Sequence, residues 1–211
     1  MGKPSTLAPE QQRALAKLSR APGIGQLYLA GGTAVAAHLG HRVSVDLDLF
    51  SRDAQVDLDP IGQALLAQFD SGEVVAQTDA TLVIRAGDLA IDVVRYPYPP
   101  LDEPAPGPQG FPTAGLRDLA TMKLSAIARR GIRRDFWDLH EIATKTAVSL
   151  KRALDAYPKR FGVQEADLYH VIRSLTYFGD ADDEPVYPRG LTQAHWEEIK
   201  RYFRSAASSV I

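Results

Sequence analysis

The chain of 211 residues contains no cysteine. This absence excludes a disulfide framework, a cysteine-based zinc site and a thiol nucleophile, and it fits a protein of the reducing cytoplasm. Long hydrophobic runs are also lacking. No acidic or basic residue lies between Arg20 and Arg42, but Pro22, His38 and five glycines interrupt that stretch. It fits neither a transmembrane helix nor a signal segment, so we expect a buried core segment and no membrane partner.

Several familiar catalytic and metal-binding motifs are missing as well. There is no Walker A sequence, no G-x-S-x-G nucleophile motif and no complete dinucleotide fingerprint. The five histidines form no zinc-binding helix pattern, and we interpret His38 and His41 as structural residues.

Neither sign of charge dominates the sequence. The 24 Lys and Arg residues against 26 Asp and Glu residues give a net charge of −2, which argues against indiscriminate binding to nucleic acid. The charges are nevertheless segregated. Residues 46–59 hold five acids and one Arg, a net of −4, whereas residues 117–134 hold six bases and one acid, a net of +5. The near-neutral total is therefore an average over an acidic segment and a basic one.

The composition, 45% hydrophobic and 24% charged, is that of a soluble globular protein with room for one large domain or two small ones. Periodicity predicts a mixed α/β first half. We expect helices over 8–18 and 34–39 and another starting at Asp59-Pro60, and strands over 26–30, 43–50, 73–77, 81–86 and 89–96, the last two joined by a Gly87-Asp88 hairpin turn.

The second half is predicted to be helical. Residues 97–112 hold seven of the 14 prolines, too many for a helix or a central strand, and are interpreted as a connector. Helices are expected over 114–129, 132–146, 148–157, 164–177 and 192–206. The predicted organisation is thus a catalytic core over 1–96, a Pro-rich connector over 97–112 and a helical domain over 113–211 that completes the active site.

Three carboxylates are the first candidates for chemistry. Alternation along the predicted strand 43–50 puts Asp46 and Asp48 on one face, roughly 7 Å apart at the backbone. Two carboxylates so placed can bind Mg²⁺, which prefers oxygen ligands. Asp92 lies in an apolar strand where an unpaired carboxylate would be costly, so a metal ion would relieve that cost. The alternative is that Asp46 and Asp48 form the solvated face of an edge strand.

A glycine turn and a lysine complete the set of candidates. Gly31, Gly32 and Thr33 stand between a buried strand and a helix, where backbone N–H groups and the Thr33 hydroxyl could face an anion. The alternative is a tight turn with Thr33 as the helix N-cap. Lys123 lies in the apolar stripe of its helix, where it could reach phosphate or metal-bound oxygens, or instead extend its amine to water.

The following helix offers a partner for Lys123. Asp135 lies at the edge of its inward face and is the candidate that would orient Lys123 or the acceptor. Asp138 points further out, and we predict a surface pair between Arg134 and Asp138, which are four residues apart.

These motifs in this order resemble the AbiEii/AbiGii-type nucleotidyltransferases, members of the polymerase-β-like nucleotidyltransferase superfamily that include toxins of toxin–antitoxin and phage-defence systems. The resemblance covers roughly residues 29–140. It is carried by Gly-Gly-Thr, by Arg42-x-Ser44-x-Asp46-Leu47-Asp48-Leu49-Phe50, by the strand with Asp92, and by Asp118-Leu119-x-x-Met122-Lys123-Leu124 leading into Arg129-Arg130-Gly131-x-Arg133-Arg134-Asp135-Phe136-x-Asp138-Leu139.

The resemblance implies a nucleotidyltransferase fold, a mixed α/β sheet flanked by helices and followed by a helical half. It implies transfer of a nucleotidyl group from an NTP to an acceptor, with tRNA 3′ ends as the acceptor in characterised relatives, and a cognate antitoxin as a partner. Mg²⁺ or Mn²⁺ would be the cofactor. The residues implied are Asp46, Asp48 and Asp92 for metal binding and catalysis, Lys123 and Asp135 for catalysis, Gly31, Gly32, Thr33, Arg42, Ser44 and Lys123 for the nucleotide, and Arg129, Arg130, Arg133 and Arg134 for the acceptor.

Two other hypotheses stay open at this point. The same metal chemistry could modify a small molecule of the antibiotic kind, in which case a closed acidic pocket would replace an arginine-lined groove. The chain could also be a nucleotide-binding or interaction module that no longer catalyses, although its intact carboxylates and lysine argue against that.

Overall fold

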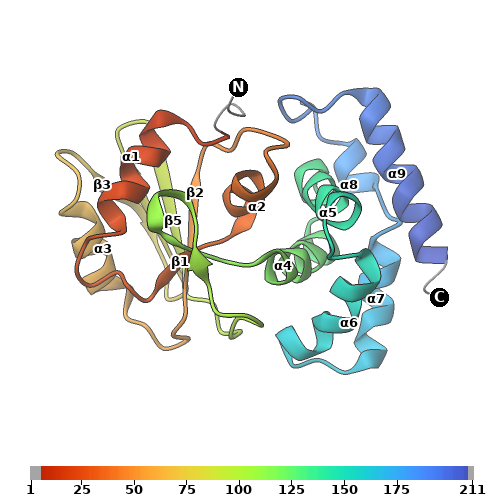
Figure 1. Cartoon of the computed structure of the whole chain (residues 1–211), viewed down its shortest axis with the longest axis horizontal. Coiled ribbons are helices and arrows are strands. Elements are labelled where there is room, and N and C mark those ends of the chain that lie inside the picture. The colour runs from red at the N-terminus through yellow and green to blue at the C-terminus, as the bar shows by residue number, and fades with distance from the viewer. Residues whose placement is uncertain (1–5, 209–211) are drawn as a thin grey trace. The chain divides into compact units, whose positions relative to one another are not determined.

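The computed structural model of the chain describes residues 6–208. The chain divides after Gly115 into two compact units, which we call the sheet unit and the helical unit (Figure 1). Within the described residues, no helix is both long enough and apolar enough to cross a membrane.

A mixed sheet forms the sheet unit, and the predicted mixed α/β fold is therefore confirmed. Its strand order is β3-β4-β5-β2-β1-β7-β6 over the described part of the chain. The central strand β2 pairs parallel with β5 and antiparallel with β1. The strands are β1 (Leu27–Leu29), β2 (Leu47–Ser51), β3 (Glu73–Gln77), β4 (Thr81–Ala86), β5 (Leu89–Val94), β6 (Ala105–Pro106) and β7 (Pro112–Thr113).

The two faces of this sheet differ in chemistry. On one face the apolar side chains of β1, β2, β4 and β5 are fully buried. The helices α1 (Pro9–Leu18) and α3 (Leu58–Leu66) lie on one side of the sheet, and α2 (Gly31–Leu39) lies on the other (Figure 1). The second face carries Tyr28, Asp48, Phe50 and Asp92, because strand alternation turns these away from the apolar core. The polar face is thus the one beside α2.

The second strand is shorter than its alternation predicts. It begins at Leu47 rather than at Val43, and the Val43 and Val45 side chains are 50% and 62% exposed. Upstream of Leu47 the segment makes only an isolated bridge between Leu7 and Ser44 in the described residues. The expected strand over 43–50 was therefore wrong at its start, because alternation alone cannot supply a partner strand or a layer to cover the valines.

Several further boundaries differ from the prediction. Helix α2 begins at Gly31 rather than at residue 34, β5 ends at Val94 rather than at residue 96, and β1 is shorter by one residue at each end. The third helix begins at Leu58 and not at Asp59, because the Asp57 carboxylate caps it by accepting a hydrogen bond from the Asp59 N–H at 3.0 Å. The proline-rich segment over 97–112 is not a simple connector. It supplies β6, the short helix η1 (Pro108–Gly110) and the start of β7, which pairs with β1, so the segment extends the sheet.

Five of the predicted helical segments form the helical unit, with shifted ends. Its elements are α4 (Leu116–Arg129), α5 (Arg133–Lys145), α6 (Leu150–Phe161), η2 (Glu165–Asp167), α7 (Leu168–Ser174), α8 (Gly179–Asp182) and α9 (Gln193–Ser208). Helix α4 packs against α5, α6 and α7, and α9 packs against α5. Aromatic rings of Phe136, Phe178, Trp196 and Phe203 meet in the core, with Phe136 within 5.1–5.7 Å of the other three.

The observed start of α3 makes a prediction about stability. Replacing Asp57 by alanine removes the acceptor of the cap, so we expect Asp57→Ala to lower the free energy of unfolding by about 1 kcal/mol. Asp57→Asn keeps an acceptor and should stay close to the native value. Urea denaturation checks this, with the exposed Asp70→Ala as the control, and an equal loss in Asp57→Asn would contradict the capping role.

Candidate active site

Two carboxylates lie side by side on the polar face of the sheet. Asp48 of β2 and Asp92 of β5 are register partners in a parallel strand pair, and neighbouring strands lie about 4.8 Å apart. Asp46 immediately precedes β2, two residues before Asp48. The structure therefore brings together the three carboxylates that the sequence singled out.

The pKa of Asp92 is shifted by its surroundings. Its side chain is half-buried, and this burial, together with the charge of nearby Asp46, raises the pKa of the Asp92 carboxyl above its ordinary value. A raised pKa means that the ionised form is disfavoured as the site stands. A divalent cation would oppose that shift, because its charge favours ionised carboxylates.

Helix α2 meets this site at its first residue. Gly31 opens the helix with a φ of +61°, and an added Cβ would lie 2.8 Å from Asp48 Cγ and 2.9 Å from Asp48 Cβ. Only glycine fits here, since a side chain would be strained by the backbone and would overlap the carboxylate. The glycine turn is thus the first turn of the helix, with Gly32 half-buried within it.

The Thr33 side chain faces inward rather than toward a ligand. It is fully buried, and its hydroxyl donates to the Asp46 carbonyl and lies 2.6 Å from the Ser44 hydroxyl. The Gln11 amide donates to the same carbonyl at 2.9 Å. Because two donors fix the backbone of Asp46, we assign Thr33 and Ser44 a positioning role, in place of the expected phosphate contact of the Thr33 hydroxyl.

Arg42 is also buried. Its guanidinium lies 3.4 Å from the Val43 carbonyl, and only 9% of the residue is exposed. Arg42 and Ser44 are thus buried residues of the segment that immediately precedes Asp46 and Asp48.

In the helical unit, Lys123 of α4 lies between two carboxylates of α5. Its ammonium is 2.9 Å from Asp135 Oδ1 and 2.8 Å from Asp138 Oδ2, and all three side chains are buried. Arg130 adds a bond from Nε to Asp135 Oδ2 at 3.0 Å. The expected surface pair of Arg134 with Asp138 was wrong, because Asp138 is fully buried against Lys123 while Arg134 is exposed.

The two partners shift each other's titration in opposite directions. Burial alone would lower the pKa of Lys123, but the charges of Asp138 and Asp135 outweigh it and raise that pKa. Burial alone would raise the pKa of Asp135, but Lys123 and Arg130 outweigh it and hold the pKa of that carboxyl below its usual range. Both groups are therefore charged near neutral pH.

The four predicted acceptor-binding arginines differ in their surroundings. Arg129, Arg130 and Arg134 are exposed. Arg133 is buried, and its guanidinium donates to the carbonyls of Glu184 and Asp182 and lies 4.1 Å from the centre of the Tyr187 ring. Arg133 therefore holds the α8 region in place, which corrects its assignment to acceptor binding.

Sequence patterns missed Gln11 and assigned Asp138 to the wrong place. Gln11 lies four and seven residues before the core residues Leu15 and Leu18, a spacing that places all three on the buried face of α1. Asp138 lies three residues after Asp135, which likewise puts both carboxylates on one helix face. The spacing could have indicated both positions, whereas the partners of the two side chains could not be read from it.

A comparison with known families decides the assignment of the chain. The family model described as nucleotidyl transferase AbiEii toxin, of a type IV toxin–antitoxin system, matches residues 13–209. The chain belongs to this AbiEii family. The resemblance carried by the motifs is thereby confirmed. An uncharacterized protein of Aquifex aeolicus, aq_aa25, is 32% identical to this AbiEii-family protein over 200 residues, covering 94% of each chain.

Solved structures resemble the fold of this AbiEii-family protein. MenT4, a nucleotidyltransferase toxin from Mycobacterium tuberculosis H37Rv, aligns with a TM-score of 0.63 at 18% identity over 94% of this chain and 82% of its own. The antibiotic-resistance factor ANT(2'')-Ia aligns with a TM-score of 0.52 at 16% identity over 76% of this chain and 98% of its own. Both support the nucleotidyltransferase fold.

The contact between α2 and Asp48 predicts a specific sensitivity. Gly31→Ala should lower the free energy of unfolding by about 2 kcal/mol or more, from the strained φ and the overlap with the carboxylate. Gly25→Ala is the matched control, because nothing lies within 4 Å of its added Cβ, and it should change stability by less than about 0.5 kcal/mol. If Gly31→Ala and Gly25→Ala lose equal free energies of unfolding in urea denaturation, close packing of Gly31 against Asp48 is refuted.

The buried ion pairs predict a pH dependence of stability. Asp135→Asn should cost about 3 kcal/mol at neutral pH, because it removes a buried charge partner of Lys123. The folded-state pKa of Asp135 is depressed, so its contribution is present above the unfolded value of about 3.9 and is lost as the pH falls through the folded one. The gap in unfolding free energy between wild type and variant should therefore close below about pH 3.9.

Urea denaturation over a pH series measures this gap. Asp155→Asn is the control, because Asp155 pairs with Lys151 on the surface of α6, with both side chains exposed, and it should cost less than about 1 kcal/mol. A gap that persists unchanged into acid would rule out Asp135 as the titrating group.

Proposed function

We propose that this AbiEii-family protein uses a divalent cation, Mg²⁺ or Mn²⁺, to transfer a nucleotidyl group from an NTP to a hydroxyl of an acceptor, with tRNA as that acceptor. The observation that carries the proposal is the pairing of Asp48 with Asp92 on adjacent parallel strands, with Asp46 two residues from Asp48. Membership of a family of nucleotidyltransferase toxins supports the same chemistry.

The donor set of the sheet unit suits a hard cation. Asp46, Asp48 and Asp92 offer only carboxylate oxygens, the ligand type that Mg²⁺ prefers. The raised pKa of Asp92 supports cation binding at this point, because a cation would favour the ionised form of that carboxyl. When bound there, the ion would neutralise phosphate charge and lower the cost of placing several anions together.

The first turn of α2 is suited to hold the triphosphate. The first N–H groups of a helix have no partner within the helix and, with the helix dipole, favour a phosphate. Gly31 and Gly32 carry no side chains of their own that would cover these N–H groups, and Thr33 anchors the turn to the backbone of Asp46. We therefore assign phosphate binding to the backbone of this turn.

The proposed reaction is an in-line displacement at the α-phosphorus. The acceptor hydroxyl oxygen forms a new bond to the α-phosphorus, the bond from that phosphorus to the oxygen bridging to the β-phosphate breaks, and pyrophosphate leaves. We assign the hydroxyl proton to the Asp92 carboxylate, because Asp92 lies beside Asp48 on the same face of the sheet.

Lys123 has a narrower proposed role than that of a free cation. An ammonium group has three N–H donors, and two of them point at Asp135 and Asp138. Two of its donors are thus used within the helical unit, and we propose that the two carboxylates fix the orientation of the Lys123 ammonium. The exposed Arg129, Arg130 and Arg134 support an anionic acceptor such as tRNA.

Transfer of labelled nucleotide tests the proposal. The full chain is incubated with each labelled NTP, bulk tRNA and Mg²⁺ or Mn²⁺, and labelled RNA is measured. We expect label at tRNA 3′ ends, and Asp48→Asn should lower the rate by more than about 100-fold, because it removes a charged ligand of the proposed cation site.

The controls separate the competing hypotheses. Asp88→Asn, in the exposed hairpin turn between β4 and β5, should leave the rate unchanged. Label on an aminoglycoside but not on RNA would favour a small-molecule acceptor. Binding of NTP by calorimetry without transfer to either acceptor would instead favour a module that does not catalyse. Loss of toxicity in a bacterial host on Asp48→Asn, and protection by a co-expressed antitoxin, would support the toxin role.

A further inference from the structure

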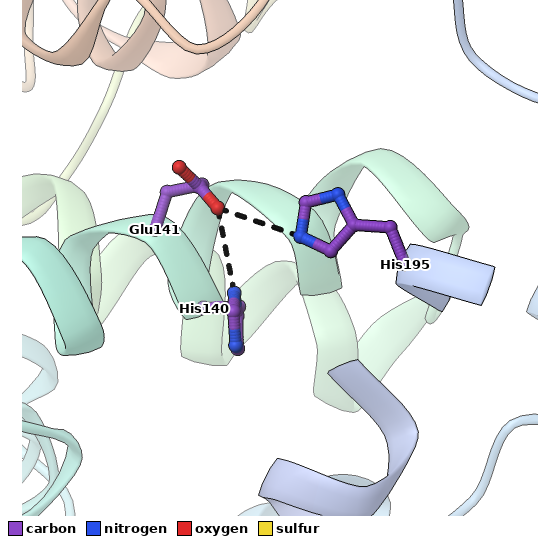
Figure 2. Close-up of side chains that lie close together, drawn as sticks. All are labelled: His140, Glu141 and His195. Carbon is purple, nitrogen blue, oxygen red and sulfur yellow. Dashed lines mark ion pairs between the residues drawn. The ribbon is translucent and has the colours of Figure 1, made fainter. Parts of the chain in front are cut away.

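Three metal-ligating side chains converge in the helical unit, at a place that the proposed transfer reaction does not use. His140 and Glu141 are neighbours on α5, and His195 lies on α9. Their ligand atoms all lie within 4.8 Å of one another. Figure 2 shows both imidazole rings turned toward the same carboxylate oxygen of Glu141.

Two of the separations in this cluster are close to those of a tetrahedral metal site. His140 Nδ1 and His195 Nε2 lie 3.5 Å and 3.7 Å from Glu141 Oε1. Ligands of tetrahedral zinc lie about 2.0–2.1 Å from the ion, which places them about 3.4 Å from one another. Two of the three separations therefore already fit one ion, and the third, between the two histidine nitrogens, is within 4.8 Å.

Burial gives a second, independent indication of a ligand. His140 is only 7% exposed, and its buried Nδ1 makes no hydrogen bond within residues 6–208. A buried polar nitrogen left in this state is costly. The nitrogen points at Glu141 (Figure 2), so a cation placed between them would satisfy it.

The surroundings would also hold the ligands in place. The second carboxylate oxygen of Glu141 forms an ion pair with Lys145 one turn along α5, which leaves Oε1 directed at the histidines. The Tyr202 ring meets the His140 ring edge to face at 5.0 Å, and the Trp137 ring meets that of His195 at 5.9 Å. These contacts restrict rotation of the Glu141 side chain and of the two imidazole rings.

We propose that His140, Glu141 and His195 form a binding site for a divalent transition-metal ion of the zinc type. Two imidazoles and a carboxylate are a ligand set that zinc uses with a fourth position open to water. His195 is the most exposed of the three, with 29% of its side chain accessible, so the site is open to solvent at that ligand.

The bound ion would fasten α9 to α5. Helix α5 also carries Asp135 and Asp138, the carboxylates that hold Lys123. Occupancy would therefore stabilise the helical unit, and this prediction is independent of the proposed transfer reaction.

Zinc binding by the full chain tests the site. The purified protein is stripped with a chelator and titrated with Zn²⁺ by calorimetry in excess Mg²⁺, and its thermal midpoint is recorded with and without Zn²⁺. We expect one equivalent to bind and to raise the midpoint. His195→Ala removes a partly exposed ligand and should weaken binding by more than about tenfold and abolish the rise, with its fold verified by circular dichroism.

Two control variants locate the ion. His170→Ala removes an exposed histidine outside the cluster and should bind zinc as the wild type does. Asp48→Asn should also bind one equivalent of Zn²⁺, which distinguishes this site from the carboxylates of the sheet unit. Absence of binding in the wild type, or unchanged binding in His195→Ala, would overturn the proposal and leave an ion-paired cluster that needs no metal.

Discussion

The pairing of β2 with β5 is the constraint on which the carboxylate site depends. In their parallel register Asp48 lies beside Asp92, and the residues on either side, Leu47 and Leu49 opposite Ile91 and Val93, fill the apolar core. A slip of one residue in either strand would bury its carboxylate in that core and expose leucine, isoleucine or valine. The energy of the core therefore enforces the placement of the acids. The placement of the proposed metal ligands and the packing of the core are therefore specified by the same alternation of side chains.

Local periodicity explains what the sequence could predict and where it failed. The strands β3 and β4 match their predicted bounds, because their limits depend on nearby turns. The start of β2 was misplaced because Val43 and Val45 continue the alternation beyond the last residue that has a neighbouring strand. The segment over 97–112 was predicted as a connector because its strand β7 pairs with β1, which lies more than 80 residues away in the sequence and could not be identified as its partner from local patterns.

Some residues of the candidate sites could be selected from the sequence, whereas their contacts could not. Asp46, Asp48 and Asp92 could be selected because a carboxylate in an apolar strand is anomalous wherever its partners lie. The true partners of Asp138 and Arg133 could not, because they depend on how helices pack. The histidine cluster shows the limit most clearly: His140 and His195 lie on separate helices, so no single helix pattern could indicate that they meet.

Ion pairs within the helical unit reduce the positive charge that the sequence assigns to residues 117–134. Residues 117–134 carry a net of +5, but the next four residues add Asp135 and Asp138, so six bases and three acids over 117–138 leave a net of +3. Lys123 is neutralised within the core of its unit by those acids. In the sheet unit, by contrast, burial and, to a smaller extent, the charge of Asp46 raise the pKa of Asp92. The helical unit balances its buried charges internally, whereas the acids of the sheet unit repel one another, and a repulsive cluster of that kind is where an added cation gains most.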